Sequence, residues 1–297
     1  MKINELLAQR PTLSFEIFPP KNKDGDITSI YSTIDQLAEL KPDFISVTYG
    51  AGGSTTRNTV EIASMIKERW HVESVAHLSC IDATADNLRA VLDQLQEKGI
   101  ENILALRGDY PKGYDPQNAP REFQHASDLA SFINAGYPGA FCLSGACYPE
   151  VHEEAASLDE DLRHLKIKAD AGVSYLTTQI FLDNNYYYRL LREARKRGID
   201  VPILAGIMPA TNAKQLLNMS KMCGCSIPYT LSAMIERFSD DPEAMREVGL
   251  NYAAWQIMDL ITNGVDGIHL YTMNRPKIAT EIMRRCDAIL KEFRHAD

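Results

Sequence analysis

The sequence lacks the features that mark membrane proteins, exported proteins and nucleic-acid-binding proteins. No apolar run approaches the roughly 18 residues of a membrane span, and the first residues, 1–5, contain no apolar core of a signal peptide. Lysine and arginine number 31 against 40 acidic residues, so the net charge is −9, and no basic block occurs. We therefore expect a cytoplasmic protein whose partners include neither a membrane nor a nucleic acid.

The six cysteines give no sign of a metal site or of a disulfide framework. Most of them lie in apolar strand or helix patterns, where cysteine behaves as a small hydrophobic residue. Cys223 and Cys225 are close in sequence, but no second Cys/His pair stands at zinc spacing. Without an export signal, we expect reduced thiols and no bound metal.

Apolar and amphipathic segments alternate along the chain, and no linker or low-complexity stretch divides them. The pattern predicts a short helix or arm at 1–12 and strands at 13–18, 44–49, 74–80, 102–106, 140–148, 175–182, 203–208 and 267–273. Helices are predicted at 27–40, 58–70, 84–98, 126–134, 157–171, 186–197, 212–223, 229–238, 242–263 (with a mild break at Gly249) and 277–293.

Eight strands, each followed by a helix, are typical of an α/β protein with a (β/α)8 TIM barrel. We therefore expect a single catalytic domain over residues 1–297, with extra helices near the C-terminal half. The alternative is an open doubly wound sheet, which would need a Gly-x-Gly-x-x-Gly turn after an early strand. The glycine-rich stretch 50–54 does not have that spacing.

Polar residues recur at the carboxyl ends of the predicted strands, which meet at one face of a barrel. They are Glu16, Thr48, Tyr49, His77, Asp109 and Gln179. Strand alternation points Glu16 away from its apolar neighbours, into the barrel mouth or interior. Apolar surroundings favour the neutral form of a carboxyl group, which suits a general acid.

Each of these candidates has a purely structural alternative. Glu16 could pair with a buried lysine or arginine, and Asp109 could pair with Arg107 or cap the next helix. His77 could be a hydrogen-bonded core residue. The segment 148–152, Tyr-Pro-Glu-Val-His, offers an aromatic ring and an imidazole for a planar ring or a phosphate, or is a surface turn.

Six segments of the chain together resemble one known family. They are 15–20 (Phe-Glu-Ile-Phe-Pro-Pro), 47–51 (Val-Thr-Tyr-Gly-Ala), 77–83 (His-Leu-Ser-Cys-Ile-Asp-Ala), 106–109 (Leu-Arg-Gly-Asp), 148–152 and 271–275 (Tyr-Thr-Met-Asn-Arg). Their order is similar to that of the methylenetetrahydrofolate reductases, in the short bacterial form that has only the catalytic barrel. The resemblance extends over about residues 10–290.

The resemblance implies an FAD-dependent oxidoreductase of one-carbon metabolism and methionine biosynthesis. NADH or NADPH would reduce the flavin and leave. The substrate 5,10-methylenetetrahydrofolate would then enter the same face and become 5-methyltetrahydrofolate, so that turnover is ping-pong. Members of the family are commonly oligomeric, which leads us to expect a homo-oligomer.

The resemblance also assigns roles to individual residues. Glu16 would help to protonate N10 of the folate and open its five-membered ring, and Asp109 would lie near the flavin pyrimidine edge, where its charge tunes the potential. The substrate contacts would be Glu16, Thr48, Asp109, Gln179, Gln215 and Arg275. The flavin contacts would be Thr48, Tyr49, Ala51, His77, Leu106, Arg107, Gly108, Asp109, Ala126, Tyr148, His152, Ala155, Asp161, His164 and Lys168.

Two positions depart from the family pattern near the flavin diphosphate. His164 stands where an asparagine is familiar, and Ile167 where an arginine is. Because isoleucine cannot pair with a phosphate, we expect Lys168 and His164 to hold the diphosphate. Backbone amides of the stretches 50–54 or 110–124 are the alternative.

Two other functions compete with this one. A flavin-free barrel lyase or aldolase would use Glu16 and Asp109 as acid and base, but it would need a Schiff-base lysine or a metal cluster that no strand end clearly supplies. A noncatalytic folate- or flavin-binding subunit of a larger complex is the third possibility.

Overall fold

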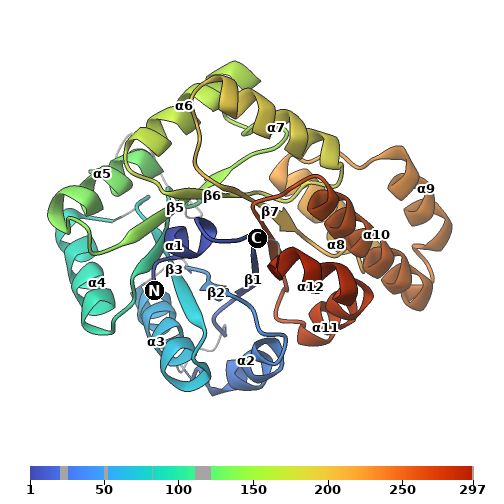
Figure 1. Cartoon of the computed structure of the whole chain (residues 1–297), viewed down its shortest axis with the longest axis horizontal. Helices are drawn as coiled ribbons and strands as arrows, with labels where there is room; N and C mark the ends of the chain where they lie inside the picture. Colours follow the sequence, from blue (N-terminus) through green and yellow to red (C-terminus); the bar gives the residue numbers. More distant parts are fainter. Residues whose placement is uncertain (21–25, 50–52, 82, 111–121, 296–297) are drawn as a thin grey trace.

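The computed structural model describes residues 1–20, 26–49, 53–81, 83–110 and 122–295. Its strands are β1 (Thr12–Ile17), β2 (Phe44–Val47), β3 (Glu73–Ser79), β4 (Asn102–Leu106), β5 (Cys142–Cys147), β6 (Tyr175–Thr178), β7 (Ile203–Ile207) and β8 (Gly267–Tyr271). Each strand pairs in parallel with the next in the chain, and β8 pairs with β1 to close the barrel. The predicted (β/α)8 fold is confirmed (Figure 1).

The helices surround this barrel on the outside, except the first, which lies across its amino-terminal end (Figure 1). They are α1 (Ile3–Leu7), α2 (Tyr31–Ala38, after the short η1, Thr28–Ile30), α3 (Gly53–Trp70), α4 (Ala85–Glu97), α5 (Ala126–Gly136), α6 (Leu158–Asp170), α7 (Asn184–Lys196), α8 (Ala213–Cys223), α9 (Tyr229–Phe238), α10 (Pro242–Thr262), α11 (Pro276–Arg285) and α12 (Asp287–His295). The expected extra helices are α8 and α9, which precede α10 between β7 and β8. Within the described ranges, no helix has both the length and the apolar character of a membrane span.

The barrel has two apolar layers because successive strand residues face opposite sides. Phe15 and Ile17 of β1 face outward and pack beneath the helices. Phe44, Leu104 and Tyr175 face inward and form a separate core inside the barrel, together with Ile3 of α1. The part of the barrel interior next to α1 is therefore filled by side chains, as in other barrels of this type.

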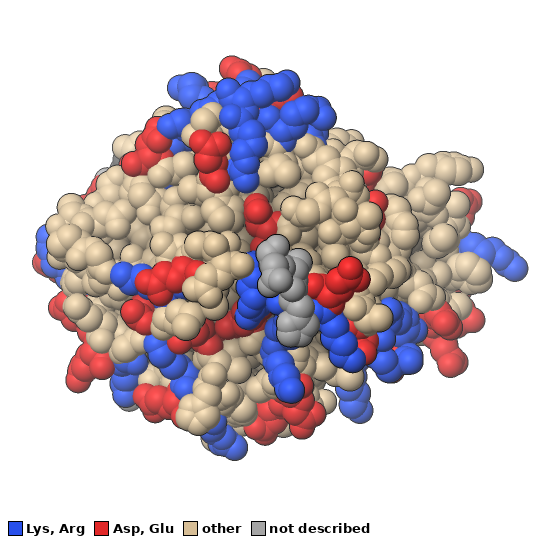
Figure 2. Space-filling model, in the orientation of Figure 1, with Lys and Arg blue, Asp and Glu red and all other residues tan. Residues whose placement is uncertain are grey.

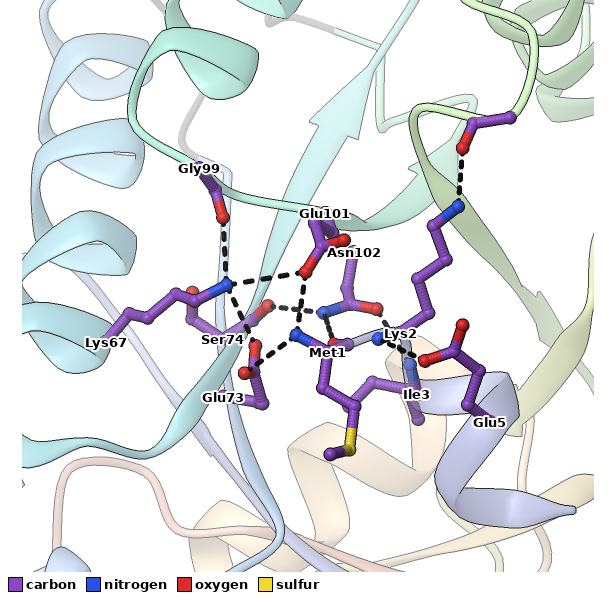
Figure 3. A network of polar contacts seen from close by, with 11 residues as sticks. Met1, Lys2, Ile3, Glu5, Lys67, Glu73, Ser74, Gly99, Glu101 and Asn102 are labelled. Atoms are coloured by element: carbon purple, nitrogen blue, oxygen red, sulfur yellow. Dashed lines mark hydrogen bonds and ion pairs between the residues drawn. The ribbon is translucent and has the colours of Figure 1, made fainter.

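A polar network joins α1 to the amino-terminal end of the barrel (Figure 3). The fully buried Asn102 accepts a hydrogen bond from the Ile3 amide at 2.9 Å and donates one to the Met1 carbonyl at 3.1 Å. The Met1 amino group pairs with Glu73 at 2.9 Å and Glu101 at 2.7 Å. Because α1 covers this end, the carboxyl ends of the strands are the face left for a ligand.

The structure corrects several predicted boundaries; α3, for example, begins at Gly53 and not at residue 58. Three further differences concern β6, the last helix and α10. Strand β6 ends at Thr178. Ile180 and Leu182 pack into a second cluster beneath α8, α9 and α10 instead of pairing, and Phe181 belongs to the main core, where its ring stacks on that of Tyr187. The last helix is broken at Cys286, whose backbone lies at φ −106° and ψ 7°. Helix α10 runs unbroken through Gly249, where a Cβ would lie 2.3 Å from the Ala210 carbonyl carbon, so glycine allows close packing there.

Lysine and arginine side chains gather along one edge of the barrel, above α6 and α7 (Figure 2). Acidic partners are interleaved with them: Arg197 pairs with Asp159 at 2.5 Å, and Lys196 pairs with Glu193 at 2.9 Å. Exposed pairs of this kind contribute little to stability. Their effect is to neutralise much of the positive charge at this edge.

Candidate functional site

The predicted site residues form two arcs at the carboxyl ends of the strands. One arc follows β2 to β5 and holds Thr48, Tyr49, His77, Arg107, Gly108, Asp109 and Tyr148. The other follows β6, β7 and β8 and holds Gln179, Gln215 (in the first turn of α8) and Arg275 (directly before α11). Glu16 stands between the arcs, because β1 pairs with both β2 and β8. Ala51 lies outside the described residues.

Glu16 points into the barrel, as strand alternation predicts, and only 7% of its surface is exposed. Its Oε2 lies 3.6 Å from His77 Nε2 and 3.7 Å from His269 Nε2. Ser14 Oγ lies 2.7 Å from the other ring nitrogen of His269. Within the described residues, the carboxyl group therefore faces two imidazoles and no lysine or arginine.

His77 is almost fully buried beside this carboxyl group. Burial lowers the pKa of His77 to about 4, although the nearby Glu16 carboxylate acts in the opposite direction. His77 is consequently neutral near pH 7. A neutral His77 does not form an ion pair with Glu16.

This buried histidine should make stability pH-dependent. The ordinary histidine pKa is 6.5, whereas that of His77 in the folded protein is about 4. Between these two pH values, His77 is protonated in the unfolded chain but neutral in the folded protein. Stability is full above pH 6.5 and falls below it, by up to about 1.4 kcal/mol per pH unit from this group. We expect His77→Gln to lose less unfolding free energy over this range in urea titrations. His164→Gln, at an exposed histidine, is the control; equal slopes in both variants would contradict the assignment.

Sequence reasoning missed His269 and Tyr271, which follow each other on the inner face of β8. His269 is buried against Ser14, and the Tyr271 hydroxyl donates to the Thr178 carbonyl at 2.6 Å. Burial raises the pKa of Tyr271 well above its ordinary value, so it remains a neutral donor. The available signal was the alternation itself, since Ser14/Glu16 and His269/Tyr271 are both polar pairs at inward positions.

A cavity of about 450 Å³ lies between β4, β5, α5 and α6. Nine of the fifteen residues that the resemblance assigns to the flavin line it: Leu106, Arg107, Ala126, Tyr148, His152, Ala155, Asp161, His164 and Lys168. Of the other described residues in that set, Thr48, Tyr49, His77, Gly108 and Asp109 lie outside its lining. The lining mixes apolar side chains with the basic groups of Arg107 and Lys168 and the carboxylates of Glu154 and Asp161, so it can contact both an aromatic and a charged part of a ligand.

Lys168 and His164 lie on the α6 wall of this cavity. Lys168 Nζ donates to the Ala146 carbonyl at 2.6 Å, and burial lowers the pKa of this amine against the attraction of Asp161. The His164 ring stacks on that of His125 with centroids 6.4 Å apart. Ile167 is 49% exposed and also lines the cavity, so a longer side chain there would reach its space.

His152 is held by hydrogen bonds on both its backbone and its ring. Its amide donates to Asp161 Oδ2 at 3.0 Å, and its Nδ1 accepts from the Glu154 amide at 3.1 Å. An amide can only donate, so a neutral His152 carries its proton on Nε2. The Tyr148 ring packs edge-on against the imidazole, with the two ring centroids 4.5 Å apart, and burial raises the pKa of Tyr148 to about 12.

Asp109 follows the cavity wall at the end of β4 and is exposed. Neither structural alternative holds for it. Arg107 pairs with Glu154, and the acid beside the start of α5 is Asp128, which accepts the amides of residues 124 and 125. Glu154 lines the cavity, although the sequence did not indicate it.

The three predicted substrate residues after β6, β7 and β8 are not linked by hydrogen bonds in the described part of the chain. The Gln179 side-chain oxygen accepts from the Ile180 backbone amide at 2.8 Å, and the Gln215 backbone amide donates to Asn212 Oδ1 at 2.8 Å. Arg275 is exposed. Among the described residues, no group of three or more His, Cys, Asp or Glu side chains could hold a metal ion.

Comparison with known proteins gives a consistent result over nearly the whole chain. The family model for methylenetetrahydrofolate reductase matches residues 2–287. The 5,10-methylenetetrahydrofolate reductase of Pectobacterium carotovorum is 40% identical over 283 residues, which cover 94% of this chain and 92% of that protein. The enzyme of Escherichia coli (strain K12) is 38% identical, with 94% and 93% covered.

More distant matches agree on the fold. Methylenetetrahydrofolate reductase (NADH) 1 of Arabidopsis thaliana is 36% identical over 95% of this chain, which corresponds to 49% of the plant protein. Among solved structures, an uncharacterized Clostridium thermocellum protein, described as binding two copies of 5-methyl-5,6,7,8-tetrahydrofolic acid, has a TM-score of 0.61. That structure is 14% identical and covers 98% of this chain and 100% of its own, so it supports the barrel alone.

Proposed function

Because the chain belongs to the methylenetetrahydrofolate reductase family, we propose that it reduces 5,10-methylenetetrahydrofolate to 5-methyltetrahydrofolate with bound FAD and with NADH or NADPH as electron donor. The two substrates would use the same face in turn, in a ping-pong cycle. Residues 1–297 would act as one catalytic domain. Since the name of the Arabidopsis relative specifies NADH, that donor is the first to test.

The cavity between β4, β5, α5 and α6 is the observation that carries this proposal. Its lining combines apolar side chains with Arg107, His152 and Lys168, which can donate to phosphate oxygens. Ala126 and Ser127, in the first turn of α5, add backbone amides at a helix end that favours anions. These donors fit a flavin dinucleotide, which is both aromatic and doubly charged at its diphosphate.

When bound, FAD would supply the two-electron chemistry between NAD(P)H and the folate. The residues of the chain would bind the substrates and move the proton. Glu16 would donate its proton to N10 of the folate and so open the ring to a cationic iminium form. His269, oriented by Ser14, would position that carboxyl group. Asp109 would favour the cation by its negative charge.

Three residues of the opposite arc would bind the folate. The amides of Gln179 and Gln215 can donate to and accept from the edge of a pterin ring. Arg275 is exposed directly before α11 and would pair with a carboxylate of the glutamate tail. The folate would therefore lie across the barrel mouth, with Glu16 between this arc and the cavity.

The absorption spectrum of the purified protein tests this function directly. We expect a yellow solution with flavin absorption that bleaches when NADH is added under nitrogen, and recovers when 5,10-methylenetetrahydrofolate follows. A colourless protein that binds no added FAD would favour the flavin-free lyase or aldolase. A yellow protein that neither substrate affects would favour the noncatalytic subunit.

Lys168 offers the diphosphate a single charge without bidentate geometry, and salt should weaken this contact to the extent that solvent reaches the amine. We expect Lys168→Ala to weaken FAD binding, and Ile167→Arg to strengthen it, since position 167 lines the cavity. The measurement is the FAD dissociation constant of each variant at low and high ionic strength, with Lys166→Ala on the same helix as control. An affinity that ignores both salt and these substitutions would mean that the diphosphate is held elsewhere.

A further inference from the structure

Four residues of the cavity lining are connected in series by hydrogen bonds. Asp161 of α6 accepts from the amide of His152, whose ring accepts from the amide of Glu154. The Glu154 carboxylate then accepts from Arg107 at the end of β4. The resemblance assigns three of the four to the flavin, and Glu154 is the member that it leaves out. Without Glu154, the series would not reach Arg107.

The contact between Glu154 and Arg107 is a bidentate ion pair. Arg107 Nη1 lies 2.5 Å from Oε2 and Nη2 lies 2.8 Å from Oε1, so both carboxylate oxygens are engaged. The guanidinium also lies over the Tyr110 ring, 5.1 Å from its centroid. A bidentate pair of this kind fixes the plane as well as the position of the guanidinium.

The pKa of each group in the pair shifts in the direction that favours its charged form. The hydrogen bonds from Arg107 lower the pKa of Glu154, and those to Glu154 raise the pKa of Arg107. The Glu154 side chain is 47% exposed and that of Arg107 is 22% exposed, so solvent weakens the attraction. The pair is therefore better suited to orienting Arg107 than to stabilising the fold.

We propose that Glu154 is a positioning residue of the cofactor site, which holds the Arg107 guanidinium in the plane in which it meets the anionic ligand in the cavity. This inference rests on the proposed function, because the ligand is taken to be FAD. A free arginine has many rotamers, and ordering it on binding costs affinity. Glu154 would remove that cost before the ligand arrives.

A simple charge effect predicts the opposite result, and the chain offers a control for it. A carboxylate near the cavity repels a diphosphate, so removing it should tighten binding through electrostatics alone. Glu153 is an exposed neighbour with the same charge, and no contact between it and Arg107 occurs among the described residues. Glu153→Gln therefore measures the charge effect without the positioning effect.

The experiment is a set of FAD binding constants and release rates for the apoprotein, measured by flavin fluorescence. We expect Glu154→Gln to bind FAD about tenfold more weakly, mainly through faster release, while Glu153→Gln matches or slightly exceeds the wild type. Glu154→Asp, which keeps the charge on a shorter side chain, should also weaken binding. Thermal melting of each apoprotein shows whether the variant is folded.

A double-mutant cycle separates positioning from any independent role of Glu154. In the Arg107→Gln background, Glu154→Gln should have no further effect, because there is no guanidinium left to orient. The inference is wrong if Glu154→Gln behaves like Glu153→Gln, or if its effect is the same in both backgrounds. A wild-type protein that does not bind FAD at all would instead contradict the proposed function.

Discussion

Replacement of Glu16 by glutamine should abolish folate reduction while leaving flavin reduction by NAD(P)H intact. Glutamine keeps the shape of the side chain between His77 and His269, but its amide has no acidic proton to transfer to the folate. Opening the folate ring requires a proton at N10, whereas the donor half-reaction does not. General acid catalysis is typically worth about 10²–10⁴-fold, which is the loss expected in the folate half-reaction.

The two half-reactions serve as controls for each other in stopped-flow measurements. The rate of flavin bleaching by NADH in the Glu16→Gln variant should stay within a small factor of the wild-type rate. Reoxidation by 5,10-methylenetetrahydrofolate should be slow at every folate concentration, because the defect lies in proton transfer. Equal losses in both half-reactions would show instead that Glu16 has a structural role.

Replacement of Gly108 by alanine should destabilise the protein and disturb the cavity wall together. Gly108 has a φ of 91°, which alanine adopts only at a cost, and a Cβ there would lie 2.0 Å from Ser79 Oγ. Ser79 Oγ donates to the Arg107 carbonyl at 2.8 Å, so the displacement would spread to the residue that lines the cavity. We expect the unfolding free energy to fall by about 2–4 kcal/mol.

Gly99→Ala is the matched control for this prediction. Gly99 also has a positive φ, of 67°, but nothing lies within 4 Å of its added Cβ. Its replacement should cost only the backbone term of about 1–2 kcal/mol and should leave FAD binding unchanged. Urea unfolding of both apoproteins gives the comparison. If the two variants lose the same free energy, the contact with Ser79 is not a constraint.

The errors in the predicted boundaries have a common cause, which is that an apolar run does not say what it packs against. Ile180 and Leu182 were predicted to end a strand, yet they pack against residues of the helices α8 to α10. Gly249 was predicted to be a mild break in α10, yet the helix is continuous there and packs closely against the backbone of Ala210. In both cases the deciding contact comes from another part of the chain.

The sequence by itself determined the eight strands, the helices between them and the inward direction of Glu16. These follow from local periodicity, which each segment carries independently of the others. The order of the motifs likewise indicated the family, and the closed barrel confirms the fold that it implied.

Only the tertiary structure decided which side chains meet. Ser14 and His269 are 255 positions apart and become neighbours because β8 closes the barrel against β1. Glu154 and Arg107 are 47 positions apart and meet because β4 and β5 end side by side at one cavity. Periodicity tells which face a residue is on, whereas its partner depends on strand register and barrel closure, and these are properties of the whole chain.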